Sequence, residues 1–187
     1  MTADGRSSLE DACNDLIAEA AALTEQLRVK KLRSLNVLER PFVIYNDLVA
    51  LAAQVTDMPF AALTFIDDTT TTIACSFEAE GSSYIELPPL MERCDTVCNT
   101  TIITPQKVNI ILDTHLDVRF ENHSKVKDGT VRFYCGVPLT TEDGYAIGSL
   151  CVFDDKPRTI EEGPVKALQA LARTILQIAQ LNSVKLY

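Results

Sequence analysis

Apolar and polar residues alternate along two neighbouring segments of the chain, residues 132–139 and 146–154. Alternation with a period of two is typical of β-strands that bury one face. The Glu142-Asp143-Gly144 sequence between them suits a three-residue hairpin loop in which Gly144 takes a positive φ. The pattern therefore predicts a β-hairpin, and one face of its first strand is apolar: Phe133, Cys135, Val137 and Leu139.

The loop also predicts which residues of the two strands lie opposite each other. If Thr141 faces Tyr145, counting back along both strands places Cys135 opposite Cys151. The same count places Phe133 and Phe153 on one face of the hairpin. Directly opposed Cβ atoms lie about 4.5 to 5.5 Å apart, which is wider than an ideal disulfide, so we expect the two sulfurs to be in contact but not bonded.

Helices are predicted at both ends of the chain. Ser7 and Ser8 precede acidic residues, which is typical of a helix start. A narrow seam with alternating spacings of four and three follows and indicates a coiled-coil type helix running to about Leu32: Leu9, Cys13, Leu16, Ala20, Leu23 and Leu27. Residues 161–185 predict a second long helix with one apolar side: Val165, Leu168, Ala172, Ile175, Ile178 and Leu181.

Residues 41–55 predict another helix, with Pro41 in its first turn. Its apolar stripe is expected to cover the sheet: Ile44, Leu48, Leu51, Ala52 and Val55. The apolar run at 60–66 suits a central strand, and the β-branched residues at 70–77 suit a second strand.

The remaining segments predict the surroundings of a site. Residues 91–103 are expected to form a short helix that carries Cys98, and residues 108–112 a short strand. The polar stretch 114–130 is predicted to be a loop. Loops over a sheet are frequent positions for small-ligand sites.

Three sequence blocks resemble one known family. The hairpin and the residues after it match the pattern RFYAG-PL-T-DG--IG-LCV-D--PR, at 132–139, 143–144, 147–148, 150–152, 154 and 157–158. Asp113 with residues 117–120 is similar to D-----DPRF, and residues 96–102 are similar to SFCAHTI, with a threonine where a histidine or aromatic residue is usual. Over roughly residues 37–181 the chain resembles a bacterial sensor-type GAF domain.

This resemblance implies an α/β fold of the α+β type. The sheet is expected to be antiparallel with five or six strands, helices on one face, and loops with a short helix and a ligand pocket on the other. Residues 1–36 are then a helical extension for dimerisation and signalling, and residues 37–187 are the GAF domain with its C-terminal helix. We expect a homodimer through the N- and C-terminal helices, because the leucine seam lies outside the domain.

Composition narrows the classes of partner. At 187 residues and 47% hydrophobic content, the chain is long enough for one well-buried core. A formal net charge of −9 opposes binding to nucleic acid or to anionic membranes. There is no apolar run of about 20 residues and no export signal, so we expect a soluble, cytoplasmic protein. We expect it to bind neither nucleic acid nor membranes.

The six cysteines do not have the spacing of a metal site. Cys94 and Cys98 stand four residues apart, but no second close pair of Cys or His completes a tetrahedron. Most thiols are expected to be reduced. Cys98 either lines the pocket, where it meets a ligand, or packs as an ordinary buried cysteine.

The candidate pocket residues come from the expected floor, covering helix and loop: Thr64, Cys75, Cys98, Asn99, Asp113, Asp117, Phe120, Phe133 and Cys135. Two interpretations stay open for them. Phe133, Cys135 and Thr64 fit a pocket floor or ordinary core. Asp113 and Asp117 could orient a polar ligand, or they could fasten the loop to itself.

The sequence does not determine which cofactor, if any, the protein binds. Covalent bilin is not expected, because no cysteine occurs in residues 117–130, where bilin-carrying relatives attach it. His115 and His123 leave haem as a possibility, although solvated loop histidines are the simpler interpretation.

We therefore predict a non-catalytic, small-molecule-binding sensor module that acts in signal transduction through its terminal helices. With no recognisable output segment in the sequence, a separate signalling protein is expected to receive the signal. Two alternatives are a cysteine-dependent enzyme of the free methionine sulfoxide reductase type and a dimerisation module with a vestigial pocket.

Overall fold

The protein is described from a computed structural model, which covers residues 3–82, 85 and 87–183. Its strands form one antiparallel six-stranded sheet in the order β3-β2-β1-β6-β5-β4. The predicted fold class is confirmed. The strands are β1 (Phe60–Ile66), β2 (Thr70–Glu78), β3 (Leu90–Glu92), β4 (Asn109–Ile111), β5 (Phe133–Thr140) and β6 (Ala146–Asp154).

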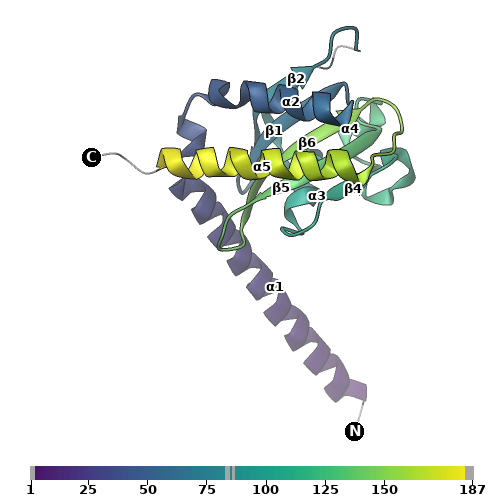
Figure 1. Ribbon diagram of the computed structural model, residues 1–187. Coiled ribbons are helices and arrows are strands. Elements are labelled where there is room, and N and C mark those ends of the chain that lie inside the picture. The colour runs from purple at the N-terminus through teal and green to yellow at the C-terminus, as the bar shows by residue number, and fades with distance from the viewer. Residues whose placement is uncertain (1–2, 83–84, 86, 184–187) are drawn as a thin grey trace.

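Helices cover both faces of the sheet, and one helix extends away from it (Figure 1). The α-helices are α1 (Ala3–Ser34), α2 (Asn46–Thr56), α3 (Cys98–Ile102), α4 (Ser124–Lys127) and α5 (Glu162–Ser183). Short 3-10 turns are η1 (Val37–Glu39), η2 (Phe42–Tyr45), η3 (Arg93–Asp95), η4 (Thr114–Leu116) and η5 (Val118–Phe120). Within the described residues, no helix combines the length and the apolar character that a bilayer crossing requires.

Two apolar cores lie on opposite faces of the sheet because successive strand residues point to opposite sides. The larger core packs under α2, α5 and the end of α1, and includes Leu63, Phe65 and Phe133. The smaller core lies under α3 and the loops, and includes Ala62, Tyr134 and Phe153. Strand β1 is buried along its whole length because both of its faces are covered.

The hairpin between β5 and β6 forms where it was predicted, and Gly144 has φ 88°. Its register changes along the strands, however: Thr140 pairs with Ala146, but Pro138 pairs with Ser149. One extra residue of β6 is accommodated here, which is a β-bulge. Beyond the bulge Cys135 pairs with Val152, so the prediction that Cys135 faces Cys151 is wrong. For the same reason Phe133 and Phe153 lie on opposite faces.

The helix predicted over residues 41–55 also differs from its prediction. A 3-10 turn occupies Phe42–Tyr45, and α2 follows from Asn46. Only part of the expected stripe covers the sheet: Ala52 is buried and Leu48 packs against the core, but Ile44, Leu51 and Val55 are 46%, 41% and 37% exposed. The buried residues of α2 are small or medium-sized, which allows close packing: Val49, Ala52, Ala53 and Thr56.

Candidate functional site

A cavity of about 50 Å³ lies between the sheet and the segment that carries α3. Strands β1, β5 and β6 supply Ala62, Tyr134 and Cys151, and α3 supplies Cys98. The other lining residues are mostly apolar and include Ile73, Leu87, Met91, Val97, Val131 and Phe153. A concave, mostly apolar space with a few polar groups is typical of small-molecule sites.

Buried hydroxyl groups connect three strands and α3 beside this cavity. Thr64 Oγ1 lies 3.2 Å from Ser149 Oγ, and both residues are fully buried. The Tyr134 hydroxyl lies 3.5 Å from Ser149 Oγ and 2.9 Å from Thr101 Oγ1. Polar groups buried in apolar surroundings are costly unless they are hydrogen-bonded. Each of these four hydroxyls accordingly has a partner within the network.

Two cysteines meet in the same cavity. The Sγ atoms of Cys98 and Cys151 are 3.8 Å apart, and Cys151 Sγ also lies 3.5 Å from the Ala62 carbonyl oxygen. The hydrogen bond from Cys151 lowers the pKa of Cys98 to about 6, although burial opposes this shift. The same hydrogen bond, together with burial, raises the pKa of Cys151 well above its usual range. Cys98 therefore ionises first, and Cys151 keeps its proton and donates it.

The predicted site residues divide between the two faces of the sheet. Thr64 and Cys98 line the cavity. Phe120 is fully buried in the core on the same side, and Asn99 accepts a hydrogen bond from Arg93.

Three predicted pocket residues lie on the wrong face. Cys75, Phe133 and Cys135 belong to the core under α2 and α5, so the prediction that they line the pocket is wrong. In β5 the alternate residues Tyr134 and Gly136, not Phe133 and Cys135, face the cavity side. Burial raises the pKa of Cys75 to about 11 and that of Cys135 to about 12, which makes both thiols inert at neutral pH.

The polar loop fastens itself to the domain. The Arg132 guanidinium donates two hydrogen bonds to Asp113, and Arg119 pairs with Asp117. These partners hold the pKa of each carboxyl below its usual range. His115 Nε2 lies 2.9 Å from the Val126 carbonyl oxygen. The His123 ring packs edge-on against Phe120. None of the four predicted ligand groups, Asp113, Asp117, His115 and His123, is among the cavity-lining residues.

A family model for the GAF domain matches residues 43–178. The chain belongs to the GAF domain family. The cyclic di-GMP phosphodiesterase PA2567 of Pseudomonas aeruginosa is 30% identical over 135 residues, which are 71% of this chain and 22% of that protein. The chain thus spans about a fifth of that relative's length.

Solved structures share the fold. The blue-light absorbing form of the Thermosynechococcus elongatus PixJ GAF domain has a TM-score of 0.63 at 20% identity, over 77% of this chain and 87% of that chain. A type II free methionine-R-sulfoxide reductase from Thermoplasma acidophilum has a TM-score of 0.56 at 8% identity, over 84% and 96% of the two chains. At these identities the similarity establishes the fold alone.

A chain of polar contacts links the cavity of this GAF domain to α1. The Glu25 carboxylate of α1 accepts hydrogen bonds from both Arg28 and Arg93. Arg93 Nε in turn donates to Asn99 Oδ1 at 2.8 Å, and Asn99 follows Cys98 in α3. Burial works against the ionised Glu25 carboxyl, but the two arginines outweigh it and lower its pKa. Sequence analysis missed this link because its members are far apart in the chain.

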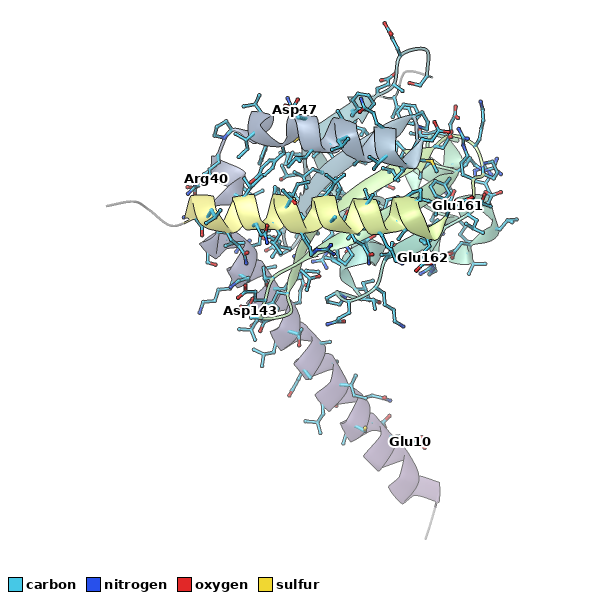
Figure 2. The ribbon with its side chains drawn as sticks, viewed as in Figure 1. Glu10, Arg40, Asp47, Asp143, Glu161 and Glu162 are labelled. Atoms are coloured by element: carbon cyan, nitrogen blue, oxygen red, sulfur yellow. The ribbon has the colours of Figure 1, made fainter. Side chains whose placement is uncertain are left out.

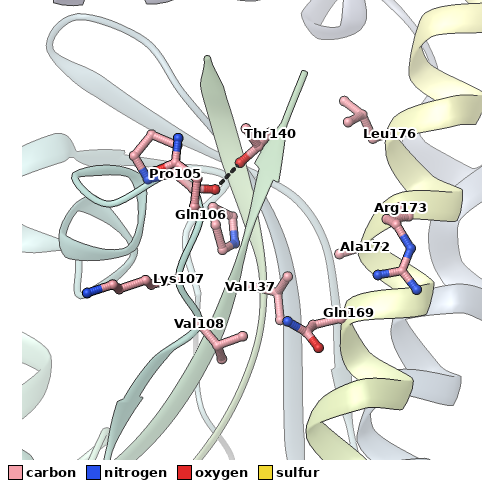
Figure 3. Close-up of a pocket in the computed structure, with 11 residues that line it drawn as sticks. Pro105, Gln106, Lys107, Val108, Val137, Thr140, Gln169, Ala172, Arg173 and Leu176 are labelled. Atoms are coloured by element: carbon pink, nitrogen blue, oxygen red, sulfur yellow. Dashed lines mark hydrogen bonds between the residues drawn. The ribbon is translucent and has the colours of Figure 1, made fainter. Parts of the chain in front are cut away.

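A second cleft of about 160 Å³ lies between α5, β5 and residues 105–108 (Figure 3). Thr140 Oγ1 donates a hydrogen bond to the Pro105 carbonyl oxygen across it. The buried residues that line it are apolar: Val137, Ala172 and Leu176. Its charged side chains, Lys107 and Arg173, are exposed and therefore solvated. The cavity under α3, which contains buried polar groups, is accordingly the better candidate site of the GAF domain.

Proposed function

We propose that this GAF domain is a non-catalytic sensor that binds a small molecule under α3 and signals through the terminal helices of a homodimer. The observation that carries the proposal is the cavity beside the buried hydroxyl network, which is linked to α1 through Asn99, Arg93 and Glu25. A ligand that changes the position of α3 would change these contacts. It would shift the population of α1 arrangements by its difference in affinity for them. A separate output protein would then read α1 or α5.

The cavity favours a small, uncharged and mostly apolar ligand with one or two hydrogen-bonding groups. Its volume of about 50 Å³ leaves room for only a few non-hydrogen atoms. Thr64 and Tyr134, whose hydroxyls belong to the buried network, are among its lining residues. A charged ligand would lose its hydration without gaining a buried counter-charge, because Asp95 and Lys125 are only half-buried.

The dimer part of the proposal comes from α1. Leu16, Leu23 and Leu27 are 67%, 57% and 39% exposed, and Figure 2 shows the side chains of this segment projecting free of the domain, with Glu10 near its far end. Arg28 and Leu32 are buried against the domain on another side of the helix, roughly 120° to 160° around its axis from the seam. A second copy of the chain fits this seam, because alternating spacings of four and three are those of a coiled coil.

A second candidate function is thiol-dependent reduction of free methionine sulfoxide. The two cavity cysteines and the shared fold with the Thermoplasma acidophilum enzyme favour it. Turnover of free methionine sulfoxide in the presence of a dithiol would support this candidate and overturn the non-catalytic proposal. A purified protein without such turnover would retire it.

Ligand binding should depend on the cavity and not on the second cleft. Mass spectrometry of small molecules released from the denatured protein is expected to detect a ligand. We expect Ala62→Leu, which fills the cavity, and Tyr134→Phe, which removes its hydroxyl, to lower occupancy roughly tenfold or more. Gln106→Ala, in the second cleft, is the control and should retain it. A folded wild-type protein that yields no released molecule would instead support a vestigial pocket.

The dimer should be parallel and formed through α1. In a parallel coiled coil the exposed Cys13 of α1 meets Cys13 of the partner subunit, so mild oxidation should cross-link the dimer, and Cys13→Ser should not cross-link. We expect light scattering to report twice 20.6 kDa for the wild type and a monomer for Leu16→Asp/Leu23→Asp. Val43→Asp changes an apolar residue that is 66% exposed elsewhere and should remain dimeric. A monomeric wild type at micromolar concentration would contradict this arrangement.

A further inference from the structure

We propose that Cys98 and Cys151 are a redox site, in which hydrogen peroxide converts the two thiols to a reversible intramolecular disulfide. The sulfurs are 3.8 Å apart, and both side chains are buried in the same cavity. An S–S bond is about 2.05 Å long, so the sulfurs must approach by roughly 1.7 Å. That displacement is within reach of a rotation of the two side chains combined with a small shift of α3.

The cavity provides space for the oxidant. Both cysteines are part of its lining, and its volume of about 50 Å³ exceeds the space that a single water molecule needs. Hydrogen peroxide is only slightly larger than water. Thr64 and Tyr134 also line the cavity, and a hydroxyl group of either residue is a chemically suitable donor to a peroxide oxygen. Small oxidants are therefore favoured over bulky disulfides such as oxidised glutathione.

The reaction balances in two steps. The Cys98 thiolate attacks one peroxide oxygen, the O–O bond breaks, and Cys98 becomes a sulfenic acid while hydroxide leaves. The Cys151 sulfur then attacks Cys98 Sγ, the S–O bond breaks, and the sulfenic oxygen leaves as water with the proton of Cys151. The two sulfurs lose two electrons, and hydrogen peroxide gains them and is reduced to water. Cys98 is the attacking thiol because its pKa is lowered to about 6.

The other four cysteines do not share this arrangement. Cys75 and Cys135 are buried on the opposite face of the sheet, and burial raises the pKa of each. Cys13 and Cys94 are exposed at separate places on the surface. The structure therefore provides a matched control, since Cys135 is as deeply buried as Cys151 but lies outside the cavity.

The disulfide between Cys98 and Cys151 would also affect α1, the helix proposed to carry the signal. It would tie α3 to β6, and the residue after Cys98 is Asn99, which is bonded to Arg93 and through it to Glu25 of α1. We expect oxidation to change amide hydrogen exchange in α1 around Glu25. Only this last step rests on the proposed function, because formation of the disulfide requires neither a ligand nor a dimer.

The experiment uses the full chain with Cys13→Ser and Cys94→Ser, so that surface thiols do not interfere. The reduced protein is treated with hydrogen peroxide, blocked with an alkylating agent and mapped by mass spectrometry without reduction. The expected result is a loss of about 2 Da, a peptide that joins Cys98 to Cys151, and full reversal by a dithiol. Further substitution by Cys135→Ser should leave the linked peptide unchanged.

Cys151→Ser should stop the reaction at a sulfenic acid on Cys98 that dimedone traps. Oxidation of Cys98 to sulfinic acid in the parent protein without any linked peptide would overturn the inference. So would a parent protein that remains fully reduced under peroxide. Because mapping of the parent protein requires no cavity substitution, it decides the question even if the cysteine variants fold poorly. A linked peptide in a protein with no ligand and no dimer would support the redox site and contradict only the proposed function.

Discussion

Gly148→Ala is expected to destabilise the protein by about 3 kcal/mol or more. A Cβ atom at this position would lie 2.0 Å from the Thr64 carbonyl oxygen and 3.0 Å from Phe65 Cα. Both contacts are with the backbone of β1, so no side chain can move aside to relieve them. The variant must separate β6 from β1 at the centre of the sheet. Urea unfolding followed by circular dichroism would measure the change in free energy.

A second glycine serves as the control. Gly163 lies in the first turn of α5, and a Cβ atom there would have no heavy atom within 4 Å. Gly163→Ala should leave stability unchanged or raise it by about 0.5 kcal/mol, because alanine reduces the entropy of the unfolded chain. If the two variants had similar free energies of unfolding, the close approach of β6 to β1 at Gly148 would be contradicted.

Gly148 also marks the place where the pairing of β5 with β6 departs from the pairing predicted from the sequence. The loop correctly predicted the pairing near Gly144, since Thr140 pairs with Ala146. The β-bulge then adds one residue to β6 between Ala146 and Ser149, and it reverses the face of every pair beyond it. Hydrophobic alternation does not reveal a bulge when both faces of a strand are buried, as they are along β6. A glycine inside a strand was the one local signal that could have indicated it.

The same change of register is the reason why the pairing of Cys98 with Cys151 was not predicted. Sequence analysis paired Cys151 with Cys135, whereas β6 turns Cys151 toward Cys98, 53 residues away in the chain. Such a contact depends on how α3 lies over the sheet, which spacing along the sequence does not determine. The family resemblance predicted that a segment with Cys98 covers a pocket, and the structure places Cys98 in the lining. The resemblance did not predict that the sulfur of Cys151 lies beside that of Cys98.

The error over α2 has a different physical cause. An apolar stripe at helical spacing predicted the buried side, but Ile44, Leu51 and Val55 are partly exposed. Ala52, which belongs to the predicted stripe, and its neighbour Ala53 are buried, because a helix that packs closely on a flat surface favours small side chains there. Size complementarity with the larger residues of the sheet, such as Phe65, decides which side is buried.

Arg28→Met is expected to cost about 3 kcal/mol of stability and to loosen α1 from the domain. Arg28 is only 5% exposed. Its guanidinium donates to the carbonyl oxygens of Ile66, at 2.6 Å, and Asp67, at 3.1 Å, as well as to Glu25. Methionine fills part of the same space but donates no hydrogen bond, so the buried carbonyl oxygen of Ile66 loses this donor, whereas Asp67 and Glu25 keep Arg93. Unfolding in urea would measure the loss, and faster amide hydrogen exchange in α1 would show the loosening.

Arg33→Met tests whether burial is the cause. Arg33 lies on the same helix and also contacts Asp67, but its side chain is 56% exposed. Water replaces the lost interactions of an exposed pair, so this variant should cost less than about 1 kcal/mol. Equal losses for the two variants would mean that charge alone, rather than satisfaction of buried carbonyls, holds α1 in place. A larger loss for Arg28→Met would identify the buried hydrogen bonds of Arg28 as what attaches α1 to the domain.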